Sequence, residues 1–117
     1  MNGIGDAMTA SVEYALRGLA TRADVRATNL ANVNTPGYRA ARVDFETALR
    51  TAVAAGAPET VGAPTISADP NLPNGNNNTV SLEGEVVGMM KDNLLRDAMV
   101  NAFNYKAGVL RAAIGSR

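Results

Sequence analysis

Apolar residues recur at helical spacing over the first third of the chain. Between residues 7 and 33, seven positions are separated alternately by four and three residues, the spacing of a helix that packs along one face. One basic residue, Arg26, interrupts this seam. The seven positions are Val12, Leu16, Leu19, Ala23, Arg26, Leu30 and Val33. The pattern predicts one long helix over about residues 7–33.

A second long helical pattern begins near Ser81 and runs almost to the end of the chain. Ser81 is a typical N-cap residue, and Glu83 and Glu85 follow in the first turn, where the helix dipole favours negative charge. The second seam consists of Val87, Lys91, Leu94, Ala98, Ala102, Tyr105, Val109 and Ala112. We predict a second long helix over residues 81–117.

The segment between the two patterns differs in character. Phe45, Leu49 and Val53 (or Ala52) share one helical face, which predicts a short helix over about 44–55, capped by Asp44 and ended by Gly56. Residues 56–79 contain four prolines and an asparagine-rich run, which is typical of a loop, with a short extended piece over about 61–66. Residues 51–80 also contain no Lys or Arg.

These patterns predict a mainly α fold. Two long terminal helices pack as an antiparallel coiled-coil-like hairpin, and the middle contributes a short helix and an irregular or weakly β segment. The corresponding division is residues 1–38, 39–80 and 81–117. Two helices leave much apolar surface uncovered, which implies self-association or insertion into a bundle. The expected helix-packing residues are Val12, Leu16, Leu19, Ala23, Leu30, Leu94, Ala98, Ala102, Tyr105 and Val109, and we expect Leu16, Leu19, Leu30, Leu94 and Val109 to be buried at helix contacts.

The first long pattern stops at a turn. The ring of Pro36 disfavours helical geometry at Thr35, and Gly37 is free to adopt a positive φ. Residues 35–38 therefore predict a type II turn, with proline at its second position and glycine at its third. Asn29 and Asn32 lie one helical turn apart just before it. They either end the helix in an ordinary way or belong to a larger motif.

Composition removes several function classes. The 117 residues carry 11 basic and 11 acidic side chains, and this balance argues against nucleic acid or an anionic membrane as the main partner. The chain contains no Cys and no His, and Asp44 with Glu46 do not face each other on a helix, so we predict no enzyme activity, no metal and no cofactor. Neither a cleaved signal peptide at residues 1–6 nor a segment of about 20 apolar residues is apparent.

Residues 28–39 resemble the signature of the bacterial flagellar rod and hook proteins. In that signature a helix ends in S/T-N-[IL]-A-N and is followed by T-x-G-Y/F and a basic residue. The matching positions are Thr28, Asn29, Leu30, Ala31, Asn32, Thr35, Pro36, Gly37, Tyr38 and Arg39. Residues 78–83 resemble the N-x-V-D/N-L segment at the start of the family's last helix, with Ser81 in place of the usual acidic residue. The resemblance covers both ends of the chain.

The resemblance implies a structural subunit of the flagellar basal-body rod, which transmits torque. The short insert, residues 39–80, is similar to that of a proximal rod subunit. The implied partners are further copies of the chain, rod proteins of the FlgC, FlgF and FlgG types, a rod-base adaptor of the FliE type, the inner-membrane ring and the flagellar type III export apparatus. The implied location is the periplasmic rod, reached without a cleaved signal peptide. An alternative is a soluble helical adaptor or export chaperone that binds partner helices.

Overall fold

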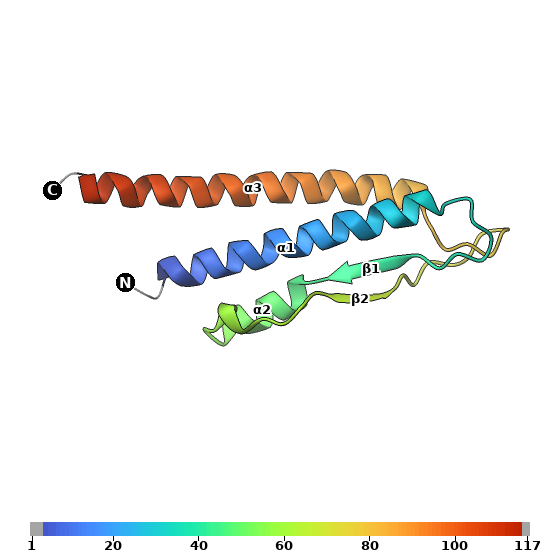
Figure 1. The fold of residues 1–117 in the computed structure, drawn as a ribbon, viewed down its shortest axis with the longest axis horizontal. Coiled ribbons are helices and arrows are strands. Elements are labelled where there is room, and N and C mark those ends of the chain that lie inside the picture. Colours follow the sequence, from blue (N-terminus) through green and yellow to red (C-terminus); the bar gives the residue numbers. More distant parts are fainter. Residues whose placement is uncertain (1–3, 116–117) are drawn as a thin grey trace.

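The computed structural model describes residues 4–115, and its two longest elements are antiparallel helices (Figure 1). In chain order the elements are α1 (Ile4–Ala31), β1 (Ala41–Asp44), α2 (Glu46–Ala54), a 3₁₀ turn (Pro58–Thr60), β2 (Thr65–Ala68) and α3 (Leu82–Gly115). The predicted mainly α hairpin with a short middle helix and a weakly β segment is confirmed. Residues 1–3 and 116–117, which belong to the predicted terminal segments, lie outside the described residues.

The molecule is a long, thin body. Its principal extents are 66 × 25 × 15 Å and its radius of gyration is 18.0 Å, against about 13 Å for a compact chain of this length. The 34 residues of α3 alone span about 51 Å at ~1.5 Å per residue. Both described ends of the chain lie at one end of this body, and the connections out of α1 and into α3 lie at the other (Figure 1).

The middle of the chain folds back along α1. Strand β1 pairs with β2 in an antiparallel ladder in which Ala41 lies opposite Ala68 and Asp44 lies opposite Thr65. In Figure 1, α1 lies between α3 on one side and the β1–β2 ribbon with α2 on the other. The extended piece expected over about 61–66 is therefore real, but the strand is Thr65–Ala68 and it has a partner in the sequence before α2.

The predicted short helix is confirmed with small shifts at its ends. Phe45 occupies the N-cap position of α2, but the Asp44 carboxylate still accepts a hydrogen bond from the Thr47 backbone N–H at 3.1 Å. Gly56 follows the helix with a φ of +75°, which a glycine adopts without the Cβ penalty. The segment therefore begins and ends for the reasons expected from its sequence.

The core of the described chain is small. It consists of the buried residues Tyr14, Ala15, Leu19 and Phe45, with Leu49, Val61 and Met99 packed against them. The Phe45 and Tyr14 rings meet edge to face, with their centroids 6.2 Å apart. A Cβ at Gly18 would collide with the Phe45 ring, so this mid-helix glycine makes room for the largest of the fully buried side chains. The cost of a glycine within a helix is offset here by packing.

The face that α3 turns toward α1 is not the predicted seam. In α1 the expected interface is partly present: Leu19 is buried, Val12, Leu16 and Leu30 are half-buried, and Ala23 is exposed. In α3 the expected interface residues are exposed in the single chain; Leu94 retains 72% of its accessible surface and Tyr105 retains 76%. The remaining members of this exposed group are Ala98, Ala102 and Val109. Leu94 and Val109, expected at helix contacts, are therefore exposed in the single chain, because α3 presents Glu85, Asp92 and Met99 to the rest of the fold instead.

Candidate functional site: a polar joint between the long helices

The turn after α1 has the geometry that its sequence predicts. Gly37 has a φ of +76°, and the Tyr38 backbone N–H donates to the Thr35 carbonyl oxygen at 3.2 Å. Both features are those of a type II turn with Pro36 at its second position. Asn32, directly after α1, connects the helix to the turn: its side-chain amide donates to the Thr28 carbonyl oxygen at 2.8 Å, and its Oδ1 accepts from the Thr35 hydroxyl at 3.1 Å.

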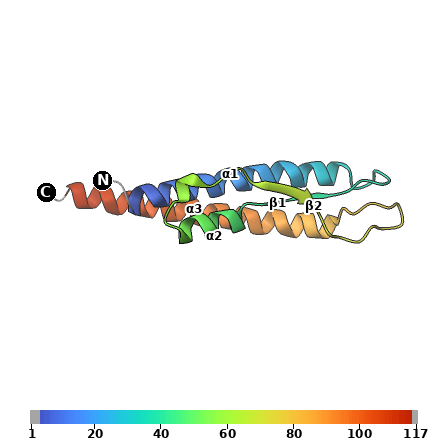
Figure 2. The same ribbon diagram turned by 90° about the horizontal axis from the view of Figure 1, so that it is seen from below.

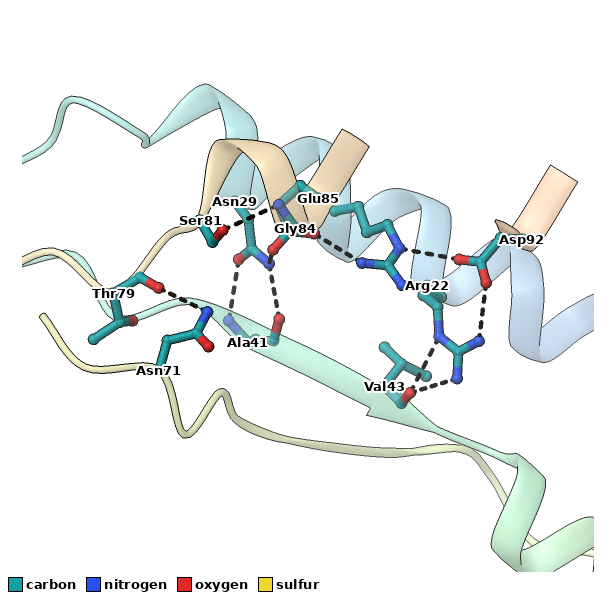
Figure 3. A network of polar contacts seen from close by, with 11 residues as sticks. Arg22, Asn29, Ala41, Val43, Asn71, Thr79, Ser81, Gly84, Glu85 and Asp92 are labelled. Carbon is teal, nitrogen blue, oxygen red and sulfur yellow. Dashed lines mark hydrogen bonds and ion pairs between the residues drawn. The ribbon is translucent and has the colours of Figure 1, made fainter. Parts of the chain in front are cut away.

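Asn29 ties three elements together from a fully buried position. Only 1% of its surface is accessible. Its Oδ1 accepts from the Ala41 N–H at 3.1 Å and its Nδ2 donates to the Ala41 carbonyl oxygen at 2.8 Å, so the side chain pairs with β1 as a neighbouring strand would. The same Nδ2 donates to Glu85 Oε2 of α3 at 2.9 Å. Asn29 therefore does more than end a helix: it joins α1, β1 and α3 (Figure 3).

Asn78 closes the end of α1 from a distant part of the chain. Its buried Nδ2 lies 2.9, 3.2 and 2.7 Å from the carbonyl oxygens of Asn32, Val33 and Thr35, and its Oδ1 accepts from the Val80 N–H at 2.7 Å. The last carbonyl groups of a helix have no partners within the helix. One asparagine, more than 40 residues further along the chain, satisfies carbonyls at the end of α1 and in the following turn.

The two segments that resemble the family signature lie against each other. The Ala40 N–H donates to the Thr79 hydroxyl oxygen at 2.7 Å, and the Thr79 N–H donates to the Tyr38 carbonyl oxygen at 3.0 Å. Gly37 N–H donates to the Asn76 carbonyl oxygen at 2.9 Å. We name residues 28–41 and 74–85 together the polar joint. The family turn residues Asn29, Asn32, Thr35, Pro36, Gly37, Tyr38 and Arg39 all belong to it, and Arg39 donates to Asn77 Oδ1 at 3.0 Å within the same chain.

Next to the joint, ion pairs connect α1 with α3 and with α2. Arg26 donates to Glu85 Oε1 and to Asp92 Oδ2, both at 3.0 Å. Arg22 donates to Asp92 Oδ1 at 3.2 Å and to Glu46 Oε1 at 2.6 Å, and its guanidinium also reaches the Val43 carbonyl oxygen at 2.8 Å. In Figure 3, each carboxylate oxygen of Asp92 is bonded to a different guanidinium. We name Arg22, Arg26, Glu46, Glu85 and Asp92 the ion-pair cluster.

Burial and charge act in opposite directions on the groups of this cluster. Desolvation lowers the pKa of Arg22, but the hydrogen bond and the charge of Glu46 outweigh it, so the pKa lies above its ordinary value. Desolvation likewise raises the pKa of Glu46, and the hydrogen bond from Arg22 more than compensates, so the pKa lies below its ordinary value. Both side chains are therefore charged at neutral pH.

Sequence reasoning missed most of the ion-pair cluster. From the sequence, Arg26 is interpreted as an interruption of an apolar seam. Glu85 is interpreted as an acidic residue favoured near a helix N-terminus. The available signal is spacing: Arg22, Arg26 and Asn29 follow one another by four and three residues, and Glu85 and Asp92 are seven apart, so each set shares a helix face. A Cβ at Gly88, between the two acids, would meet the Arg26 guanidinium and displace it from its present position.

The chemistry of the joint and the cluster is that of a structural connection. Carboxylates, guanidiniums and amides meet partners from the same chain and fix the relative position of α1, β1 and α3. Among residues 4–115, no group of three His, Cys, Asp or Glu side chains is arranged to hold a metal ion. None of the helices in this described range has the length and apolar character needed to cross a membrane.

An antiparallel helix pair, locked at one end by a turn and a returning loop, is the class of structure that these observations define. Residues 13–39 match a protein-family model described as flagella basal body rod protein. The matched range contains most of α1, Asn29, Asn32 and the whole type II turn. The match supports the resemblance to the flagellar basal body rod family. A comparison with curated proteins returned no match.

Proposed function

We propose that this chain is a structural subunit of the bacterial flagellar basal-body rod, of the proximal rod type FlgB. The observation that carries the proposal is the match of residues 13–39 to the rod family model. It is supported by the joint, in which the second segment that resembles the family, residues 78–83, is bonded to the matched turn. The short middle segment, residues 39–80, favours the proximal type over rod and hook proteins with large inserted domains.

In this proposal residues 1–38 and 81–117 form the rod core, and the exposed seams of the long helices contact neighbouring subunits. Leu94, Tyr105 and Val109 are exposed in the single chain, and Ala98 and Ala102 between them permit close approach of a helix axis. A helix that is apolar on its outer face gains stability when neighbours cover it. The neighbours would be further copies of the chain and rod proteins of the FlgC, FlgF and FlgG types.

The base of such a rod would contact an adaptor of the FliE type and the inner-membrane ring. The subunit would leave the cytoplasm through the flagellar type III export apparatus and reside in the periplasmic part of the basal body. Torque would pass through closely packed helices, and the ion-pair cluster would keep α1 and α3 of each subunit in fixed register.

Deletion and complementation of the gene test this function. We expect the deletion strain to be non-motile and to lack rods beyond the inner-membrane ring, and the restored strain to contain the chain in purified basal bodies. A cryo-EM map of those basal bodies would place α1 and α3 in the proximal rod. Motile deletion cells, or basal bodies without this chain, would contradict the proposal.

The adaptor or chaperone alternative is favoured by one observation, the exposed apolar face of α3. It gives no reason for the matched turn. Affinity purification of the chain from growing cells separates the two functions, because a rod subunit co-purifies with rod and rod-base proteins, whereas a chaperone co-purifies with cytosolic clients.

A further inference from the structure

Residues of α2 and α3, which lie on the same side of α1 in Figure 2, line an open apolar groove. Its volume is about 490 Å³, and its apolar walls are Phe45, Leu49, Val53, Ala54, Leu95 and Met99. Val53 keeps 51% of its surface and Leu95 keeps 37%, so the side chains of the chain itself leave the groove unfilled. An apolar hollow of this kind gains stability from an apolar side chain that fills it.

The rim of the groove carries one acidic and one basic side chain. Glu46 and Arg50 both border it. The Glu46 carboxylate is already paired with Arg22 at 2.6 Å, whereas Arg50 is exposed and has no ion pair among the described residues. The groove therefore favours an occupant that combines an apolar side chain with negative charge nearby.

One loop of the chain has both of these properties. Leu72 retains 90% of its surface, more than any other large apolar residue of the described chain. Pro70 and Pro73 restrict the backbone on either side, and Asn71 fixes the loop by donating from its N–H to Asp69 Oδ1 at 3.0 Å and from its Nδ2 to the Thr79 carbonyl oxygen at 3.3 Å. No Lys or Arg occurs between residues 51 and 80, so Leu72 projects from an acidic segment.

We propose that Leu72 of one copy of this chain inserts into the α2–α3 groove of a second copy. The proposal rests on the proposed rod function, in which the second copy is the next subunit. Apolar fit supplies the attraction, and the acidity of the loop around Asp69 matches the positive Arg50 rim. The loop and the groove are different surfaces of the molecule, so the contact is heterologous, and a heterologous contact that does not close a ring extends into a helical filament.

Disulfide cross-linking tests this contact directly, because the full chain contains no cysteine of its own. Leu72→Cys and Val53→Cys are made in separate full-length chains that differ in mass by a tag, mixed, and exposed to a mild oxidant. We expect the mixed-mass dimer in roughly tenfold higher yield than when Leu82→Cys replaces Leu72→Cys, because a cysteine is itself a small apolar side chain that enters the groove at position 72. Leu82 is a matched control because it is also an exposed leucine, at 54%.

Two further variants sharpen the result. Ala54→Cys is a second groove position, which serves if Val53→Cys lowers the helical content measured by circular dichroism. Arg50→Glu in the groove chain should reduce the yield of the Leu72 cross-link and leave the control yield unchanged. Equal yields for Leu72→Cys and Leu82→Cys at both groove positions would overturn the proposal.

The outcomes also separate this contact from the rod function. If the chain is present in basal bodies but the cross-link fails, the rod function stands and the loop-to-groove contact is wrong. If the cross-link forms but the chain is absent from basal bodies, the contact between copies stands and the rod function is wrong.

Discussion

At the scale of single residues, two buried asparagines determine how the ends of the long helices meet. Asn29 and Asn78 each expose only 1% of their surface, and each uses both ends of its amide. An amide donates and accepts at once, so it can pair with a backbone N–H and a carbonyl oxygen together. Neither aspartate, which only accepts when ionised, nor leucine, which is nearly isosteric, could do the same.

Asn78→Ala should destabilise the chain by about 1–3 kcal/mol, because it removes the buried amide that bonds to three carbonyl oxygens after α1 and takes the acceptor from the Val80 N–H. Thermal unfolding followed by circular dichroism measures this effect. Asn93→Ala, at an exposed position of α3, is the matched control and should leave the melting temperature nearly unchanged. Equal melting temperatures for the two variants would show that the hydrogen bonds of the Asn78 side chain do not contribute to the stability of the fold.

Gly37→Val should disturb the turn through backbone conformation alone. A Cβ at Gly37 would meet no atom within 4 Å, but the φ of +76° is strongly disfavoured for a β-branched residue. We expect a loss of about 1–3 kcal/mol in unfolding free energy, in line with other strained backbone positions. Gly62→Val is the control, since Gly62 is equally open and lacks a positive φ. Normal stability and normal motility with Gly37→Val would contradict the type II assignment.

At the scale of elements, the sequence pattern predicts which helices exist but not which faces meet. The heptad-like spacing and the turn chemistry predicted α1, α2, α3 and the type II turn because these depend on neighbouring residues. The pairing of α1 with α3 depends on Arg22 and Arg26 finding Asp92 more than 60 residues away. An apolar seam predicts contact with some helix, and in α3 it is the opposite, partly charged face that meets α1.

The β ribbon was underpredicted for a similar reason. Its strands have four residues each, and β2 is exposed at every position, so neither shows the alternation that marks a half-buried strand. The ribbon forms because the Asn29 side chain bonds to one edge of β1. The other edge of β1 then pairs with β2. A buried side chain from a helix thus determines where the strand lies, and no local pattern reveals it.

The Arg22–Glu46 pair gives the chain a pH-dependent contribution to stability. The pKa of Glu46 lies below its ordinary value of 4.5, so the pair stabilises the fold fully above about that pH, and the contribution is lost as the pH falls through the lower folded value. The Glu46 side chain is 42% exposed, so we expect about 1 kcal/mol or less. Glu46→Gln should lower the melting temperature slightly at pH 7 and leave it unchanged at pH 2.

Glu83→Gln, at an exposed position of α3, is the matched control for this pH comparison. If the melting temperatures of wild type and Glu46→Gln differ by the same amount at pH 7 and pH 2, the ion pair is not the cause of the difference.

At the scale of the whole molecule, the contacts between the two long helices near the joint are polar, whereas many apolar side chains of α3 are exposed. Near the joint, α1 and α3 meet through ion pairs and a buried amide, while the outer face of α3 carries exposed Met90 and Leu94 at 62% and 72%. The only buried residue that α3 contributes is Glu85. A single chain therefore holds α3 mainly over residues 85–99, and neighbours would be needed to hold the rest.

Hydrogen exchange should reveal this gradient in the purified chain. We expect backbone amides of residues 102–115 to exchange faster than those of residues 14–29, because α3 packs on the core only as far as about Met99. Covering of the outer seam by neighbours in an assembled rod should slow exchange in residues 102–115 selectively. Uniform protection of α3 in the free chain would show that the helix needs no neighbour for its stability.

The hydrogen bonds around Ala40 have a consequence for protein engineering. The Asp69 N–H donates to the Ala40 carbonyl oxygen at 2.9 Å, and the Ala40 N–H donates to the Thr79 hydroxyl oxygen, so the middle of the chain leaves and rejoins the helices at one fixed stem. Whatever lies beyond such a stem can change in length at little entropic cost. A fluorescent domain or affinity tag inserted at Gly62, in the open connection before β2, should therefore leave the joint of the two long helices intact.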